Sequence, residues 1–240
     1  MPSFDVTAYS GTCWRFVEDQ NTSSTMRLVD TPDEQAILEE LLDATKPPVP
    51  VACRHLHYLQ FTPFRYVARH STRFRMQGER AGVFYAAEAV ATAATEVAFY
   101  RLLFYLESPA TQRPSAPFEM TAFASRIRTA RCVDISAFPD DQRARYADPV
   151  DYAPCHALAA KARAARGEVI RFPSVRDKGG MNLAVLDCAA FADSTPRDLQ
   201  GWWFRFTDAG LFAKRRFGEE SLQFAFADFA DDPRIAALLG

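Results

Sequence analysis

The sequence predicts an α+β protein with a mixed β-sheet core and flanking helices. The apolar pattern changes repeatedly between strand-like alternation and helix-like spacing. These changes do not follow the regular strand–helix–strand order that builds a doubly wound parallel sheet. A chain of 240 residues with 48% apolar residues is also long enough to bury its core without a metal or disulfide staple.

The first predicted element is a helix over about residues 32–45. Thr31 supplies a hydroxyl cap, Pro32 suits the first turn, and acidic residues follow at the positive end of the helix. The helix is expected to stop at the proline cluster of residues 46–50. This cluster predicts a boundary between an N-terminal extension, residues 1–50, and a main domain, residues 51–240.

The main domain is predicted to mix strands and helices. A long helix is expected over roughly residues 88–106, because good helix formers continue there without glycine or proline. Residues 118–135 alternate well enough for one or two strands, and the alanine-rich stretch 154–165 predicts another helix. Further strands are expected at residues 82–85, 168–172, 181–188, 201–207 and 222–229, with a short helix at the end.

The distribution of charge is more informative than its sum. The net charge of −2 gives no general case for binding nucleic acid or an acidic membrane. Residues 51–80 nevertheless hold six arginines against one glutamate, interleaved with five Tyr and Phe side chains. Guanidinium groups suit pyrophosphate and rings suit a base, so the segment fits a nucleotide. It fits single-stranded nucleic acid or a solvated, codon-biased loop equally well.

Glu96 stands out because it falls within the apolar stripe of the long predicted helix. A carboxylate that faces a core is costly unless it is paired or hydrogen-bonded, and arginine is the abundant candidate partner. Groups held in this way are enriched at active sites. A structural Glu–Arg tie between subdomains is the alternative interpretation.

Two further patterns bear on chemistry. Ser174 lies between arginines at a predicted strand-end turn, where its hydroxyl could contact an anion or a ribose, although a serine after proline commonly just makes a turn. Cys53, His55 and His57 would share one face of a strand and could meet a zinc ion. Because no second cluster supplies a fourth ligand, no metal is expected.

The chain is expected to be cytoplasmic. It begins without the basic and apolar regions of a signal peptide. Its most hydrophobic stretch, residues 83–106, carries two glutamates and an arginine and is a poor membrane span. The five cysteines are odd in number and widely spaced, which is typical of unpaired thiols in a reducing compartment.

Several motifs taken together resemble the RES-domain family, which is named for an arginine, a glutamate and a serine. The resemblance spans about residues 58–188, and the order and spacing of the motifs make it specific. The run Cys13–Glu18 also looks like the longer branch of the family. The motifs are Thr62-Pro63-Phe64-Arg65-Tyr66, Ser71-Thr72-Arg73-Phe74-Arg75, Gly82-Val83-Phe84-Tyr85-Ala86-Ala87-Glu88, Thr95-Glu96 and Pro173-Ser174-Val175-Arg176.

The resemblance implies an ADP-ribosyltransferase-like fold and an enzyme that consumes NAD as its substrate. It places Glu96 near the ribose, Tyr85 against the nicotinamide and Arg73 on a phosphate or ribose, with Ser174 as the family serine. The dinucleotide-binding residues implied are Arg65, Tyr66, Arg75 and His57. Many relatives carry a serine or threonine near residues 151–156, where this sequence has Ala153, Cys155 and His156, so the family serine is either Ser174 or lost there.

The resemblance also implies a bacterial toxin that is neutralised by an Xre-type antitoxin protein, with a homodimer as a further expectation. The acceptor of the ADP-ribosyl group is left open among phosphate, water and a protein side chain. Neither a membrane nor a directly bound nucleic acid is expected. Two other functions stay open at this point: a non-catalytic module that binds single-stranded RNA or an acidic partner, and a metal-dependent hydrolase built on Cys53, His55 and His57.

Overall fold

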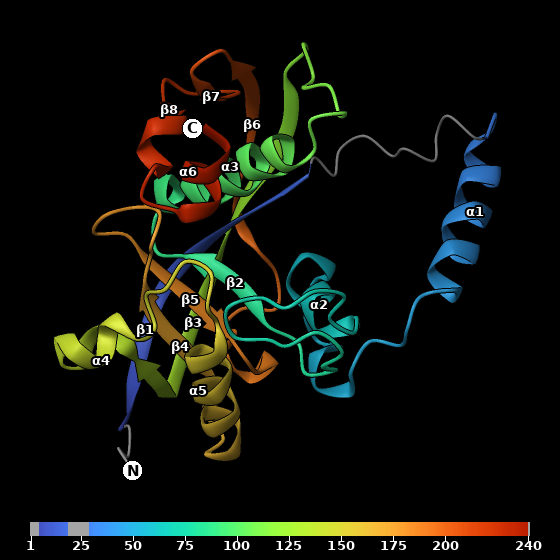
Figure 1. The fold of residues 1–240 in the computed structure, drawn as a ribbon. Coiled ribbons are helices and arrows are strands. Elements are labelled where there is room, and N and C mark those ends of the chain that lie inside the picture. Colours follow the sequence, from blue (N-terminus) through green and yellow to red (C-terminus); the bar gives the residue numbers. More distant parts are fainter. Residues whose placement is uncertain (1–4, 19–28, 240) are drawn as a thin grey trace.

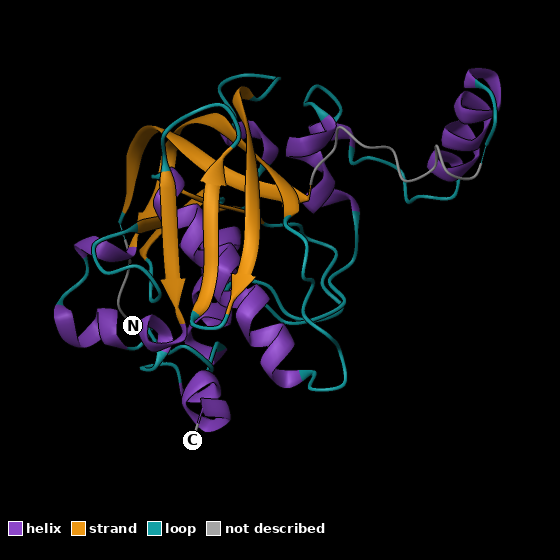
Figure 2. Ribbon diagram, turned by 90° about the horizontal axis from the view of Figure 1, so that it is seen from above, coloured by secondary structure: helices purple, strands orange, loops and turns teal. Residues whose placement is uncertain are grey.

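The protein is described by a computed structural model that covers residues 5–18 and 29–239. The described part is built on a single sheet with strand order β1-β2-β5-β4-β3-β6-β7-β8 (Figures 1 and 2). The strands are β1 (Val6–Glu18), β2 (Phe84–Ala87), β3 (Phe118–Asp134), β4 (Val169–Pro173), β5 (Met181–Val185), β6 (Arg197–Thr207), β7 (Gly210–Arg215) and β8 (Ser221–Ala225).

Helices lie around this sheet, so the predicted α+β class is confirmed. The sheet is mixed, because β3 and β4 pair in parallel and the other pairs are antiparallel. The α-helices are α1 (Pro32–Ala44), α2 (Tyr58–Arg65), α3 (Val90–Glu107), α4 (Asp140–Ala144), α5 (Ala153–Ala164) and α6 (Pro233–Leu239). Among the described residues, short 3₁₀ helices join them: η2 (Val51–Cys53), η3 (Ile135–Ala137), η4 (Cys188–Ala190) and η5 (Phe226–Phe229).

The strand β1 determines where the cavity of the molecule forms. It pairs with β3 from Val6 to Glu18, but it meets β2 only where Trp14 faces Ala87. The pairings of β1, β2, β5, β4 and β3 therefore form a closed ring that is loose on one side. Beyond Trp14, β1 stays with β3 and leaves β2, and both diverging strands line the cavity described below.

The helix α3 packs across this opening. It is apolar over much of its circumference, and its buried residues join the core formed with β6, β7, β8 and the C-terminal segment. Phe99 is fully buried and meets the ring of Phe229 edge-on, with 5.4 Å between ring centroids. The face of α3 that carries Glu96 is consequently held firmly against the sheet. No helix among the described residues is long and apolar enough to cross a membrane.

The predicted division at residue 50 does not describe the sheet. Residues 6–18 were assigned to an extension, yet they form β1 within the core, while residues 1–4 and 19–28 lie outside the described part of the chain. β1 includes Gly11 and alternates only weakly, so its local sequence does not predict a strand. It is a strand because β3 pairs with it. The helix expected over about 32–45 is present as α1, with a capping box between Thr31 and Glu34. It buries no residue and stands apart in both views (Figures 1 and 2).

Two expectations about cysteine and histidine are corrected. Cys53 and Cys188 form a disulfide, whereas Cys13, Cys132 and Cys155 are free and buried. Residues 53–57 are not a strand, because η2 ends at Cys53 and His57 caps the N-terminus of α2. Cys53, His55 and His57 therefore do not share one face of a strand. In the disulfide, Cys53 also has no thiolate that could bind zinc. Within residues 5–18 and 29–239, no group of three or more His, Cys, Asp or Glu side chains could hold a metal.

Gly82 permits the close approach of β2 and α2. A Cβ atom there would lie 2.4 Å from the Cα of Phe64 and 2.7 Å from the carbonyl oxygen of Pro63, and neither backbone can yield. Replacing Gly82 by alanine is expected to lower the free energy of unfolding by about 2 kcal/mol in urea denaturation. Ala81→Ser, at the exposed neighbouring position, should stay within about 0.5 kcal/mol of wild type. Equal stability of the two variants would contradict this packing argument.

Candidate functional site

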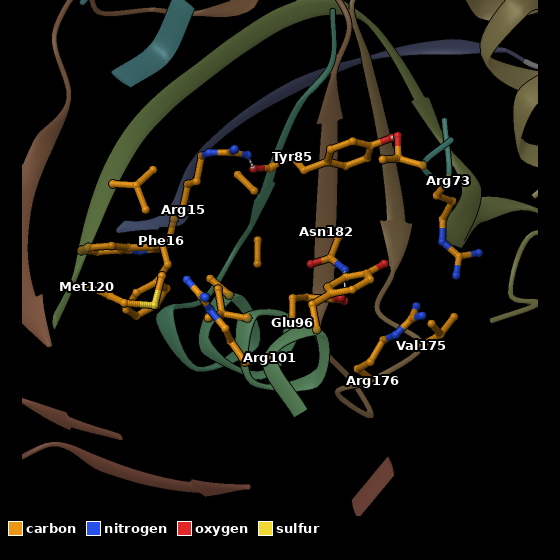
Figure 3. A pocket seen from close by; sticks show the side chains of 18 of the residues that line it. Arg15, Phe16, Arg73, Tyr85, Glu96, Arg101, Met120, Val175, Arg176 and Asn182 are labelled. Atoms are coloured by element: carbon orange, nitrogen blue, oxygen red, sulfur yellow. Dashed lines mark hydrogen bonds between the residues drawn. The ribbon is translucent and has the colours of Figure 1, made fainter. Parts of the chain in front are cut away.

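A cavity of about 660 Å³ lies between α3 and the diverging strands β1 and β2 (Figure 3). Its size is typical of ligand-binding pockets. Residues of β1, β2, β3, α3 and β5 line it, together with the turns at residues 72–73 and 175–176. In the view of Figure 3, Glu96 and Asn182 lie between Arg15 on one side and Arg73 and Arg176 on the other.

Glu96 is held in the cavity by two neutral donors. Its Oε1 atom accepts hydrogen bonds from Ser174 Oγ at 2.8 Å and from Asn182 Nδ2 at 2.7 Å. Among the described residues, its Oε2 atom has no hydrogen bond and no arginine lies within ion-pair distance. The predicted arginine partner of Glu96 is thus wrong. Neutral partners orient the carboxylate without cancelling its negative charge, so that charge remains available to a ligand.

Ser174 orients the carboxylate because its own hydroxyl is fully engaged. It directly follows β4, and its Oγ atom accepts from the backbone N–H groups of Arg176 at 3.1 Å and Asp177 at 3.0 Å. The hydroxyl proton is therefore left to point at Glu96. Since the sheet, the turn and α3 all meet at this hydrogen bond, Ser174 is a positioning group for Glu96 rather than a nucleophile.

Arg15 and Arg73 place positive charge in the same cavity. Arg15 Nη1 donates to the Tyr85 carbonyl oxygen at 2.7 Å, and Arg73 Nη1 donates to the Tyr146 carbonyl oxygen at 2.7 Å. Arg15 Nε and Arg73 Nη2 are buried and have no partner. Burial lowers the pKa of Arg15 to about 10, so it stays protonated at neutral pH. Neither guanidinium has a carboxylate within 4.0 Å among the described residues, so both retain donors that could bind an anion.

Tyr85 contributes a fixed ring rather than a proton. Its hydroxyl accepts from the Phe74 backbone N–H at 2.9 Å and lies 2.9 Å from Thr72 Oγ1, to which it can donate. Burial raises the pKa of Tyr85 to about 12. The phenol is therefore neutral at physiological pH, and its ring lines the cavity as a rigid surface for a planar group.

Comparison with known proteins places this geometry in a family. Residues 49–207, well over half of the chain, match the RES domain. The chain belongs to the RES domain family. No curated protein matches the chain. Among solved structures it is similar to a chain of the crystal structure of the M. tuberculosis MbcT–MbcA toxin–antitoxin complex, with 12% identity, 95% of this chain and 91% of that chain covered, and a TM-score of 0.44.

Three of the predicted site residues line the cavity of this RES domain, a fourth contacts one of them, and the other four lie elsewhere. Arg73, Tyr85 and Glu96 line it, and Ser174 contacts Glu96 directly, which favours Ser174 over the segment near Ala153. The prediction that Arg65, Tyr66, Arg75 and His57 bind a dinucleotide in this site finds no support in the geometry, because none of the four lines the cavity.

These four residues instead stabilise the irregular segment around α2. Arg65 binds the Pro47 carbonyl oxygen and the Asp43 carboxylate. Arg75 binds backbone carbonyl oxygens, including that of the exposed Tyr66, and His57 Nδ1 accepts from a backbone N–H of α2. A loop-rich segment leaves many carbonyls without secondary-structure partners, and arginine supplies the donors. Of the six clustered arginines, Arg65 and Arg75 are hydrogen-bonded to this segment and Arg73 is buried. Only Arg54, Arg69 and Arg80 are exposed.

The sequence-based interpretation missed three residues of the cavity. Asn182 carried a usable signal, because it is a polar residue within a buried strand. Arg176 was noted only as a flank of Ser174. Arg15 lies before the matched residues 49–207. The run Cys13–Glu18 that contains it resembles the longer branch of the family, but only the pairing of β1 with β3 shows that Arg15 reaches the cavity.

Proposed function

We propose that this RES domain degrades NAD as the toxin component of a toxin–antitoxin pair. One observation carries the proposal: a carboxylate with uncancelled charge, Glu96, shares a cavity with two guanidinium groups that lack carboxylate partners, Arg15 and Arg73. A dinucleotide has a pyrophosphate for the guanidinium groups, and the ribose beside its positively charged nicotinamide suits the carboxylate. The resemblance of the sequence motifs to NAD-consuming members of the family supports the same substrate.

The proposed chemistry is cleavage of the nicotinamide–ribose bond. The bonding electron pair leaves with nicotinamide, which becomes neutral, and the ribose carbon gains the character of an oxocarbenium ion. Glu96 accepts from a ribose hydroxyl and stabilises this developing positive charge. An acceptor oxygen then bonds to the same carbon: water yields ADP-ribose, phosphate yields the 1-phosphate ester of ADP-ribose, and a protein side chain becomes ADP-ribosylated.

The partners belong to the same proposal. By its resemblance to toxins of this family, the chain is proposed to pair with an Xre-type antitoxin and to form a homodimer. Induction of the chain in bacteria should arrest growth and lower the cellular NAD content, and co-expression of its antitoxin should restore both. Growth arrest without loss of NAD would contradict the proposed activity.

A single assay tests the reaction. Purified full-length protein is incubated with NAD, with and without phosphate and a chelator, while nicotinamide and the second product are followed by chromatography. We expect release of nicotinamide in the presence of chelator, and the second product identifies the acceptor. If the protein binds single-stranded RNA instead, NAD should persist and RNA binding should weaken steeply with salt.

Ser174→Ala tests the orientation of Glu96. The variant loses one of the two hydrogen bonds to Oε1, and such a bond contributes about 1 kcal/mol. We expect nicotinamide release to fall about fivefold in kcat, with a smaller change in KM. Ser115→Ala, in an exposed loop, is the matched control and should behave as wild type. An unchanged kcat in Ser174→Ala would show that Asn182 alone suffices to position the carboxylate.

A further inference from the structure

The C-terminal segment contributes to the cavity although it lies beyond residues 49–207, the part of the chain that matches the RES domain. Phe229 and Ile235 anchor this segment in the same core as α3, and both are buried. Asp232 lies between them and is only 7% exposed. A buried carboxylate in such a place requires partners, and the partners lead directly to the cavity.

Arg176 is the cavity residue that depends on this segment. Its side chain is 4% exposed, and its guanidinium carbon lies 4.4 Å from the centroid of the Phe99 ring. Its Nη2 atom lies 3.6 Å from Asp232 Oδ2 and 3.4 Å from the Pro149 carbonyl oxygen. Among the described residues, Asp232 supplies the only carboxylate within 4.0 Å of Arg176. Its Nε atom is buried and has no hydrogen-bond partner there, so the guanidinium retains donor capacity for a ligand.

Arg234 holds Asp232 in place. Its Nε atom donates to Asp232 Oδ1 at 2.9 Å and its Nη2 atom donates to Oδ2 at 2.8 Å. Burial alone would raise the pKa of Asp232, but the hydrogen bonds from Arg234 and the charges of both arginines outweigh it and lower the pKa. The carboxylate is therefore ionised at neutral pH. Two positive charges around one negative charge leave this cluster with a net positive charge at the end of the cavity that also holds Arg73 (Figure 3).

We infer that Asp232 is a positioning residue that holds Arg176 against Phe99, so that the guanidinium can bind an anionic group of the substrate. The inference rests on the proposed function, because it adds Arg176 to the guanidinium groups, those of Arg15 and Arg73, that would hold the pyrophosphate of the dinucleotide. Loss of the carboxylate would leave Arg176 and Arg234 as neighbouring buried charges of like sign, and their repulsion would turn Arg176 away from this position.

The test compares Asp232→Asn with Asp231→Asn in the full-length protein. Asp231 is the exposed neighbour in the chain and provides a matched loss of charge. We expect Asp232→Asn to raise the KM for NAD about tenfold, with kcat changed less than about threefold, and Asp232→Glu to recover part of the affinity. A residue that merely stabilises the fold would lower Tm and the active fraction, and hence the apparent kcat, without changing KM.

A second experiment uses a double variant in which like-charge repulsion cannot impair folding. Asp232→Asn combined with Arg234→Gln deletes the carboxylate without leaving two buried like charges, and it should still raise KM. In an Arg176→Gln background, Asp232→Asn should cause no further rise, because Asp232 acts through Arg176. Full and independent effects of the two substitutions would overturn the inference.

Binding of inorganic pyrophosphate, measured by calorimetry, separates this inference from the proposed function. If the wild-type protein does not consume NAD but Asp232→Asn weakens pyrophosphate binding about tenfold while Asp231→Asn does not, the proposed function fails and the anion-positioning role stands. If NAD is consumed and neither KM nor pyrophosphate affinity changes in Asp232→Asn, the positioning role fails alone.

Discussion

Replacing Glu96 by glutamine is expected to reduce the kcat of nicotinamide release by about a thousandfold. Glutamine keeps the side-chain oxygen that accepts from Ser174 and Asn182, so the local geometry survives. What disappears is the negative charge, which neither of these neutral partners cancels. Stabilisation of the cationic transition state is the largest effect that we assign to any residue of this site. Because the charge on the ribose develops only in the transition state, its loss is expected in kcat.

The measurement follows nicotinamide release at saturating NAD, with thermal unfolding as the check on the fold. Glu107→Gln is the matched control, because Glu107 lies at the exposed end of the same helix, α3. It should retain wild-type activity. Glu96→Gln that releases nicotinamide at the wild-type rate would remove the central residue from the proposed mechanism.

Replacing Arg15 by glutamine is expected to raise the KM for NAD about thirtyfold, because charge-assisted hydrogen bonds to phosphate are lost. The free energy of unfolding should not decrease along with the affinity. Arg15 is half-buried beside Phe84 without a carboxylate partner among the described residues, and this burial already lowers its pKa to about 10. Glutamine can still donate to the Tyr85 carbonyl oxygen, so the free energy of unfolding should stay the same or increase.

Steady-state kinetics and urea denaturation test the two halves of this prediction. Arg128→Gln, at an exposed position of β3, removes an arginine without touching the cavity and should change neither KM nor stability. A gain in stability together with a loss of affinity is the signature of a group held at a cost for binding. A loss of stability with unchanged KM would make Arg15 a structural residue.

The regular elements with strong local signals could be predicted from the sequence. The helix expected at 88–106 is α3, the alternating stretch 118–135 is the single strand β3, and the alanine-rich helix at 154–165 is α5. The short strand expected at 82–85 is β2, shifted by two residues. Local propensity and periodicity were sufficient because each of these segments has a pattern stronger than the influence of its neighbours.

Elements with weak local patterns were not predicted. The strand β1 contains glycine and little alternation, and its pairing partner in β3 lies more than a hundred residues away. The helix α2 contains Pro63 and has polar residues on both sides. Such segments acquire their structure from the surfaces they pack against, and a local pattern does not describe those surfaces.

By itself, the sequence determined the α+β class, the resemblance to the RES family, and the residues Arg73, Tyr85, Glu96 and Ser174. Only the tertiary structure decided which arginines face the cavity. Arg15 and Arg176 line it, Arg65 and Arg75 do not, and Asp232 of the C-terminal segment contacts Arg176. The physical reason is that a guanidinium can donate to a backbone carbonyl as well as to a phosphate. Long-range strand pairing and helix packing determine which of the two it meets.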